Sequence, residues 1–249
     1  LGTLLVNPTA EASTNLPEPI ITVFNDRLSR MPLAWIEHFY ERSKIVFCLN
    51  KPEPFPGITR TERFEWLPGA YAPEVHQRFY PRPDDGRAAA IGYVGTFNAW
   101  RKYRFLQRLA DKAPIQIYGN NWNNAPEGFT KKFWRGAAAY GENYAEMLST
   151  FYIAVNVLES RWGPNRKCFE IPHQALMLVE WAPGVRDLFG EQHDEAPWVF
   201  STPQDLARSA LYYADNPSEI ALHRALQQKI IEPYTYDFQA AVIKSAFER

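Results

Sequence analysis

The chain has 249 residues, enough for one large domain or two small ones, and its 46% hydrophobic and 22% charged residues are typical of a globular protein. The 27 basic and 28 acidic residues leave a net charge of −1, which argues against binding to bulk DNA or RNA. No apolar run approaches the length of about 18 residues that a transmembrane helix needs, and the first residues lack the basic region of a signal peptide.

The first part of the chain contains few predicted elements. Helical spacing of apolar residues predicts a helix that Ser29 caps and that has Pro32 in its first turn. Four prolines and an Asp-Asp-Gly turn between residues 68 and 87 predict a linker between two lobes. We therefore expect a first domain at 1–80 and a second at 81–249. Short apolar runs predict strands at 4–6, 20–24, 45–49 and 64–68.

The second part alternates strands and helices, which is typical of a parallel sheet. Three helices close it, and their predicted caps are Thr202, Asn216 and Thr235. The fold class is therefore expected to be α/β. Strands are predicted at 88–95, 115–119, 137–140, 152–156, 176–179 and 198–200, with helices at 100–112, 144–151, from about 165, and at 183–189.

Ligands of doubly wound sheets bind at the carboxyl ends of strands, so polar residues that follow strands are of interest. Gly95 and Thr96 follow the first strand of the second part, and Arg101 or Lys102 adds positive charge for a diphosphate. The alternative interpretation is a tight turn with solvated basic residues, since neither a G-x-G-x-x-G nor a P-loop motif is present. The basic and aromatic cluster at 100–104 has helical spacing, which disfavours nucleic-acid binding.

The segment 156–170 carries the most specific pattern. A buried strand runs into a Gly-Pro loop and then into a helix start with Arg166 and Lys167, which suits a diphosphate. Glu170 lies within the same turn, where a carboxylate can accept both hydroxyls of a ribose. The alternative is that Glu170 only complements the helix dipole and that the two cations are solvated.

The chain resembles the group 1 type of GT-B glycosyltransferases, and most closely the spore-maturation CgeB-like branch. This resemblance implies two Rossmann-like lobes, with the amino-terminal lobe reduced or truncated and the nucleotide-sugar donor bound on the carboxy-terminal lobe. The stretches that carry it are 91–96 followed by Arg101, 117–120, the strand end at Asn156, the Arg-Lys-Cys-Phe-Glu-Ile-Pro run at 166–172, 183–189 and 212–217.

The resemblance also implies roles for individual residues. Glu170 would hold the ribose, Arg101 with Arg166 or Lys167 would hold the diphosphate, and the stretch 139–141 would meet the base. Arg166 and Lys167 would be catalytic, because they stabilise the leaving nucleoside diphosphate. The donor site implied in this way contains Gly95, Thr96, Arg101, Tyr118, Tyr140, Glu159, Arg166, Lys167, Phe169 and Glu170.

Two features depart from the family pattern. Group 1 enzymes often place two glutamates eight positions apart, whereas Glu159 and Glu170 are eleven apart and position 162 is Trp. The sugar contact of the earlier glutamate is therefore not assigned. Asp26, after the strand at 20–24, is the nearest candidate for a catalytic base, although a carboxylate in a turn is the simpler interpretation.

The expected function is transfer of a sugar, such as a hexose, from a nucleotide-diphosphate sugar to an unknown acceptor. The alternatives are a non-catalytic nucleotide-sugar-binding module and a nucleotide-sugar epimerase on the same fold. No cofactor and no metal are expected, because the five histidines show no metal-ligand spacing, and His193 is expected to face water. Two cysteines, Cys48 and Cys168, cannot form a disulfide framework, so we expect a cytoplasmic protein, with peripheral membrane contact left open.

Overall fold

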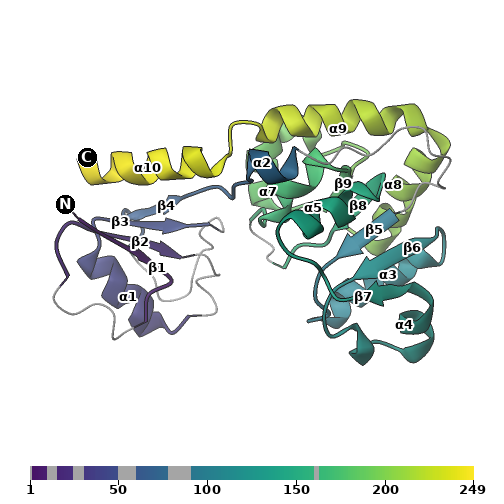
Figure 1. The fold of residues 1–249 in the computed structure, drawn as a ribbon, viewed down its shortest axis with the longest axis horizontal. Coiled ribbons are helices and arrows are strands. Elements are labelled where there is room, and N and C mark those ends of the chain that lie inside the picture. Colours follow the sequence, from purple (N-terminus) through teal and green to yellow (C-terminus); the bar gives the residue numbers. More distant parts are fainter. Residues whose placement is uncertain (1, 10–15, 25–30, 50–59, 78–90, 160–162) are drawn as a thin grey trace.

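A computed structural model describes residues 2–9, 16–24, 31–49, 60–77, 91–159 and 163–249. It contains two parallel β-sheets, each with helices packed on it, in two lobes (Figure 1). Asp26 and Ser29 lie outside the described residues, as does the predicted domain boundary at 80 and 81. The fold is therefore of the α/β class, as the alternation of elements predicted.

The sheet of the first lobe has the strand order β1-β2-β3-β4, and all of its strand pairs are parallel. Helix α1 (Leu33–Arg42) packs on one face through Ile36 and Phe39. The other face is covered by α10 (Tyr236–Glu248), which returns from the opposite end of the chain (Figure 1). The four predicted strands are confirmed as β1 (Thr3–Val6), β2 (Ile20–Phe24), β3 (Ile45–Cys48) and β4 (Phe64–Trp66).

The sheet of the second lobe has the order β10-β9-β8-β5-β6-β7 and is also parallel. When the strands are numbered along the chain from β5, they have the 3-2-1-4-5-6 order of a doubly wound sheet. The order in which strands are added therefore reverses at the neighbouring strands β5 and β8. The central strands β5, β8 and β9 are buried along their whole length, as expected for a sheet covered on both faces. The strands are β5 (Ile91–Val94), β6 (Ile115–Tyr118), β7 (Trp134–Gly136), β8 (Ile153–Asn156), β9 (Leu176–Glu180) and β10 (Val199–Phe200).

The helices of the second lobe lie close to the predicted positions, except that no helix was predicted at Glu127–Phe133. Among the described helices, none combines the length and the apolar character needed to cross a membrane. The α-helices are α3 (Trp100–Ala110), α4 (Glu127–Phe133), α5 (Glu142–Ser149), α6 (Lys167–Glu170), α7 (Pro183–Phe189), α8 (Pro203–Asp215) and α9 (Pro217–Ile231), with 3₁₀ turns at Trp122–Asn124, Ile171–His173 and Glu191–His193.

Two of the three predicted caps are confirmed. Thr202 and Asp205 form a reciprocal capping box, and the Thr235 hydroxyl accepts the N–H of Phe238. The prediction for Asn216 is wrong, because its side chain donates back to the carbonyl oxygen of Tyr212 instead. An amide at this position can satisfy the end of the preceding helix as readily as the start of the next one.

The strand predicted at 137–140 is wrong by a few residues. Strand β7 ends at Gly136, where a φ of 131° turns the chain away from the sheet. Its position is set by pairing with β6 and by the indole of Trp134, whose Nε1 donates to the carbonyl oxygen of Gly119 at 2.9 Å. Tertiary contacts therefore decide this edge strand, and the apolar alanines after it lie outside the sheet.

Part of the predicted linker is built into the fold. Tyr71 is buried and pairs with Thr235 in an isolated parallel bridge, and Pro73 starts the short helix α2 (Pro73–His76). The two passages between the lobes therefore run side by side at this point, and residues 60–77 include packed structure where the proline content predicts a linker.

The prediction that His193 faces water is wrong. Its side chain is buried, and the centres of the His193 and Trp198 rings lie 5.2 Å apart.

Candidate functional site

The turn after β5 meets the turn after β6 at close range. The N–H of Gly95 donates to the carbonyl oxygen of Tyr118 at 2.8 Å, and the indole of Trp122 donates to the carbonyl oxygen of Gly95 at 2.7 Å. A Cβ atom at Gly119 would lie 2.0 Å from the carbonyl oxygen of Gly95, and Gly119 has a φ of 149°. Glycine is therefore required at 119 for these two strand ends to approach each other.

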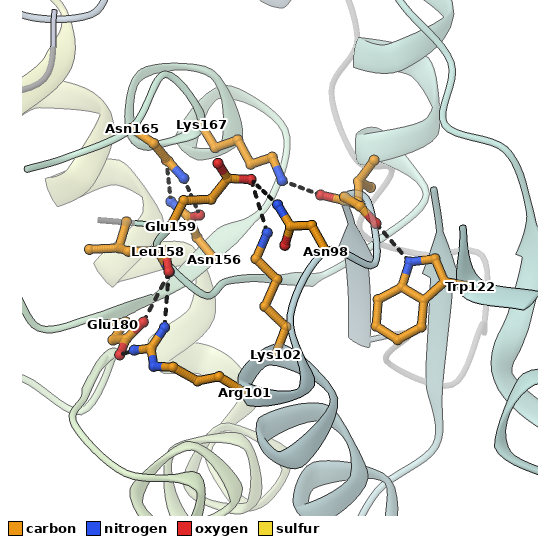
Figure 2. A network of polar contacts seen from close by, with 12 residues as sticks. Asn98, Arg101, Lys102, Trp122, Asn156, Leu158, Glu159, Asn165, Lys167 and Glu180 are labelled. Atoms are coloured by element: carbon orange, nitrogen blue, oxygen red, sulfur yellow. Dashed lines mark hydrogen bonds and ion pairs between the residues drawn. The ribbon is translucent and has the colours of Figure 1, made fainter. Parts of the chain in front are cut away.

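Lys167 reaches this turn from α6. Its Nζ donates a hydrogen bond to the carbonyl oxygen of Val94, the last residue of β5 (Figure 2). The same Nζ lies 5.3 Å from the ring centre of Tyr93. A Cβ atom at Gly95 would be 2.8 Å from the same Nζ. The absence of a side chain at 95 thus leaves the space that the ammonium group occupies.

Glu159, three residues after the end of β8, joins the loop there to the turn after β5. Its Oε1 accepts hydrogen bonds from Nζ of Lys102 and from Nδ2 of Asn98, each at 3.0 Å (Figure 2). Lys102 is buried, so the carboxylate provides a counter-charge for a cation that has little contact with water. Glu159 therefore lies where the strand order of the doubly wound sheet reverses, which is where such sheets bind ligands.

The electrostatics of this region favour an anion. Burial, and then the nearby ammonium of Lys102, lower the pKa of Lys167 to about 8, while Glu159 and Glu170 act in the opposite direction. Lys102 is paired with the carboxylate of Glu159, and Lys167 close by is held in its charged form only weakly. A bound anion such as a diphosphate would relieve this repulsion.

Arg101 is held by an ion pair. Its guanidinium pairs with Glu180, the last residue of β9, and its Nη1 donates to the carbonyl oxygen of Leu158 at 3.1 Å (Figure 2). Glu180 is buried and also accepts the N–H of Leu158 at 3.0 Å. Arg101 therefore neutralises a buried carboxylate and braces the strand ends, and this placement does not support the predicted contact with a diphosphate.

Glu170 forms a second polar centre together with Arg166. Nε of Arg166 lies 2.5 Å from Oε1 of Glu170, and Nε2 of His76 lies 3.7 Å from the same oxygen. The carboxyl group is buried, and this burial raises its pKa even though Arg166 and His76 act to lower it. The hydroxyl of Tyr144, which interacts electrostatically with Glu170, is buried with no hydrogen-bond partner among the described residues.

The comparison with protein families decides the identity of the fold. Residues 101–245, more than half of the chain, match the sequence profile of a family described as glycosyl transferase-like. The chain belongs to this glycosyltransferase family. A search of curated proteins gave no match for the chain.

Solved structures agree with this assignment at the level of the fold. HepE of Anabaena, solved in complex with UDP, is 10% identical, with a TM-score of 0.73 over 93% of this chain and 73% of that one. Sucrose-phosphate synthase of Thermosynechococcus elongatus is 11% identical, with a TM-score of 0.70 over 94% and 68%. Trehalose-6-phosphate synthase OtsA is 13% identical, with a TM-score of 0.62 over 93% and 67%. The expected GT-B type of fold is therefore confirmed.

An amide pair that the sequence did not reveal holds the loop of this glycosyltransferase that carries α6. Asn156, the last residue of β8, and Asn165 exchange hydrogen bonds of 2.9 and 3.0 Å (Figure 2). The pair closes the loop on itself and so fixes where α6 begins. Asparagine at the end of a buried strand was the available signal, since a buried amide needs a partner.

The structure brings some predicted site residues together and separates others. Gly95, Lys167 and Glu159 gather at the turn after β5, and Arg166 pairs with Glu170. The side chain of Phe169 is wholly buried against Tyr234 and Gly69, and this placement does not support the predicted contact with a donor.

The remaining predicted residues lie nearer the edges of the site. Thr96 is half-buried in the turn after β5, and the ring of Tyr118 packs against Phe151 at 6.1 Å. Tyr140 is 80% exposed in the segment between β7 and α5. Among the described residues, no group of three His, Cys, Asp or Glu side chains is placed to hold a metal ion.

Proposed function

We propose that this glycosyltransferase transfers a sugar, such as a hexose, from a nucleotide-diphosphate sugar to an acceptor that is still to be identified. The observation that carries the proposal is the position of the Lys167 ammonium group. It lies at the carboxyl end of β5, beside Gly95 and near the buried Lys102. The HepE structures, which contain UDP and UDP-glucose, support a nucleotide-sugar donor. We place the chain in the CgeB-like branch on the motifs from 91 to 172.

The proposed donor lies across the ends of β5 and β8. Lys167 and Arg166 contact the diphosphate, Glu170 accepts the ribose hydroxyls, and the exposed ring of Tyr140 meets the base. A buried carboxylate is well suited to a pair of hydroxyl donors, because hydrogen bonds to a charged acceptor are strong where water is excluded.

The reaction itself requires charge stabilisation at the diphosphate. An acceptor oxygen bonds to the anomeric carbon and loses its proton, while the bond from that carbon to the diphosphate oxygen breaks and its electron pair stays on the diphosphate. The ammonium of Lys167 and the guanidinium of Arg166 stabilise the negative charge that develops there. Asp26 is the proposed base that takes the proton from the acceptor.

A panel of UDP-, ADP- and GDP-sugars tests the proposal by calorimetry and by release of the nucleoside diphosphate. We expect binding of one nucleotide class and slow hydrolysis of its sugar, both weakened by Lys167→Met but not by Lys112→Met, which removes an exposed lysine on the same lobe. An isomerised donor would indicate an epimerase, and binding without turnover in the presence of an acceptor panel would indicate a binding module. Failure to bind any of these nucleotides would overturn the proposal.

A further inference from the structure

The carboxylate of Glu170 has two cationic neighbours that differ sharply in exposure. Arg166 lies on the solvent side, with 64% of its side chain exposed, whereas the side chain of His76 is only 5% exposed. Arg166 precedes Glu170 by four residues, but His76 comes from α2, in the segment that joins the two lobes. The Arg166 side chain therefore has room to move toward solvent, whereas the His76 ring is enclosed by the protein.

Local contacts fix the ring of His76. Its Nδ1 lies 3.2 Å from the amide nitrogen and 3.0 Å from the carbonyl oxygen of Ala72, and the carbonyl oxygen of His76 accepts the side-chain amide of Gln174. If the ring is neutral and Nδ1 accepts the N–H of Ala72, the proton resides on Nε2. If the ring is charged, both nitrogens carry protons. In both of these states an N–H at Nε2 faces Glu170, whereas a neutral ring whose Nδ1 donates to the carbonyl oxygen of Ala72 would leave Nε2 without a proton. The carboxylate beside Nε2 favours the forms that carry a proton there.

The neighbouring ring does not change this arrangement. His173 packs against Tyr71 with ring centres 3.9 Å apart, and burial together with the proximity of His76 lowers its pKa to about 4. His173 is therefore neutral at pH 7 and adds no charge beside His76. The phenols of Tyr144 and Tyr236, which also interact with Glu170, have raised pKa values because of burial and stay protonated.

We propose that His76 is a positioning residue that holds Glu170 in its ribose-binding orientation when Arg166 turns to the diphosphate. This inference rests on the proposed function and deepens it. When Arg166 leaves, a buried carboxylate without a partner would be unfavourable, and it would protonate or move. Because His76 approaches from the inner side, it stays with Glu170, and the outer side of the carboxylate becomes available to the ribose hydroxyls.

Two substitutions of His76 separate this role from a purely structural one. The amide of Gln reaches the position of Nε2, whereas the shorter amide of Asn reaches that of Nδ1 and keeps only the contact with Ala72. We expect His76→Asn to weaken UDP binding about tenfold, because Glu170 loses its partner, and His76→Gln to stay within about twofold of the unaltered protein. Equal losses, or a larger loss for His76→Gln, would indicate that the contact with Ala72 matters instead and would overturn the proposal.

The same comparison in a Glu170→Gln background tests whether His76 acts through Glu170. We expect His76→Asn to cause no further loss of UDP affinity there, and a persisting tenfold loss would contradict the proposal. Failure of the unaltered protein to bind UDP, ADP or GDP would overturn the proposed function. Normal binding that His76→Asn leaves unchanged would overturn only the role proposed for His76.

A measurement without nucleotide and without a His76 variant covers the case in which the variants do not fold. The ring ¹⁵N resonances of His76 are compared in the unaltered protein and in Glu170→Gln. We expect the Nε2 resonance to shift, while the ring of His223, which contacts Tyr213 and Glu219, stays unchanged. An unshifted His76 resonance would overturn the proposal.

Discussion

The ammonium of Lys167 donates a hydrogen bond to the carbonyl oxygen of Val94 and so ties the start of α6 to the end of β5. The two residues are far apart in the sequence, yet this contact joins the loop after β8 to the turn after β5. Desolvation of its ammonium group, and then the nearby charge of Lys102, lower the pKa of Lys167 to about 8.

The affinity for UDP should therefore depend on pH in a defined direction. Below pH 8 the free protein holds Lys167 charged, and above it the ammonium loses its proton, so that binding of an anion must take one up. The terminal phosphate of UDP is already ionised above about pH 7, and it contributes no change in this range. We expect affinity to be flat up to about pH 8 and then to fall by up to about tenfold per pH unit, as measured by calorimetry.

The variant Lys167→Arg provides the control for this pH dependence. Arginine stays charged throughout the range, so any affinity that the variant retains should not decline above pH 8. A flat profile in the unaltered protein would contradict the assignment of Lys167 to the diphosphate.

Gly95→Ala should impair both stability and binding. The added Cβ would lie 2.8 Å from Nζ of Lys167 and 2.8 Å from the hydroxyl of Tyr93, so the ammonium must leave its place. We expect the free energy of unfolding to fall by about 1–3 kcal/mol. UDP affinity should fall as well, because the lysine moves.

The matched control for Gly95 is Gly128→Ala in α4. A Cβ there meets nothing within 4 Å, and the position is helical, so the substitution should stabilise the protein by about 0.5–1 kcal/mol and leave UDP affinity unchanged. Urea unfolding and calorimetry on both variants check the pair. Equal effects of the two substitutions would rule out a specific requirement for glycine at 95.

Glu170→Ala should weaken UDP binding by about 1–3 kcal/mol, since the ribose hydroxyls would lose a charged acceptor in a buried site. Glu127→Ala is the control, because its carboxylate is exposed on α4 of the same lobe. Calorimetry with UDP measures both variants. An affinity unchanged by Glu170→Ala would remove this residue from the proposed donor site.

Tyr144→Phe should leave the free energy of unfolding unchanged or raise it by about 1 kcal/mol, because a buried hydroxyl without a hydrogen-bond partner is unfavourable. The comparison is Tyr213→Phe, which removes a hydroxyl that lies 2.7 Å from Nδ1 of His223 and should lower stability by about 1 kcal/mol. Urea unfolding distinguishes the two. A loss at Tyr144 as large as that at Tyr213 would mean that its hydroxyl has a partner.

The elements that the sequence predicted well are those set by local chemistry. Strands such as β8 and β9 are buried along their length and so appear as continuous apolar runs, and the Thr202 cap is decided within four residues. Strand β7 was misplaced because its pairing with β6 and the indole contact of Trp134 decide its position, and neither is visible in the local pattern.

The candidate site likewise contains residues that the sequence indicated and residues that only the fold brings together. Gly95 and the run 166–170 were singled out because they follow buried strands, where ligands of such sheets bind, and Glu159 was implied by the resemblance to group 1 glycosyltransferases. The pairing of Arg101 with Glu180, and that of His76 with Glu170, join residues far apart in the sequence. Only the folded chain brings these charges together, so residue spacing could predict neither the displaced role of Arg101 nor the presence of His76.

The packing of α10 has a consequence for how the protein is made. One face of the first sheet is covered by Ala246 and its neighbours, and Phe247 lies against Gly2. Strands β1 to β4 precede α10 in the sequence, so on the ribosome this apolar face lacks the cover of α10 until that helix has been synthesised. The first lobe can therefore complete its core only after the second lobe has been synthesised.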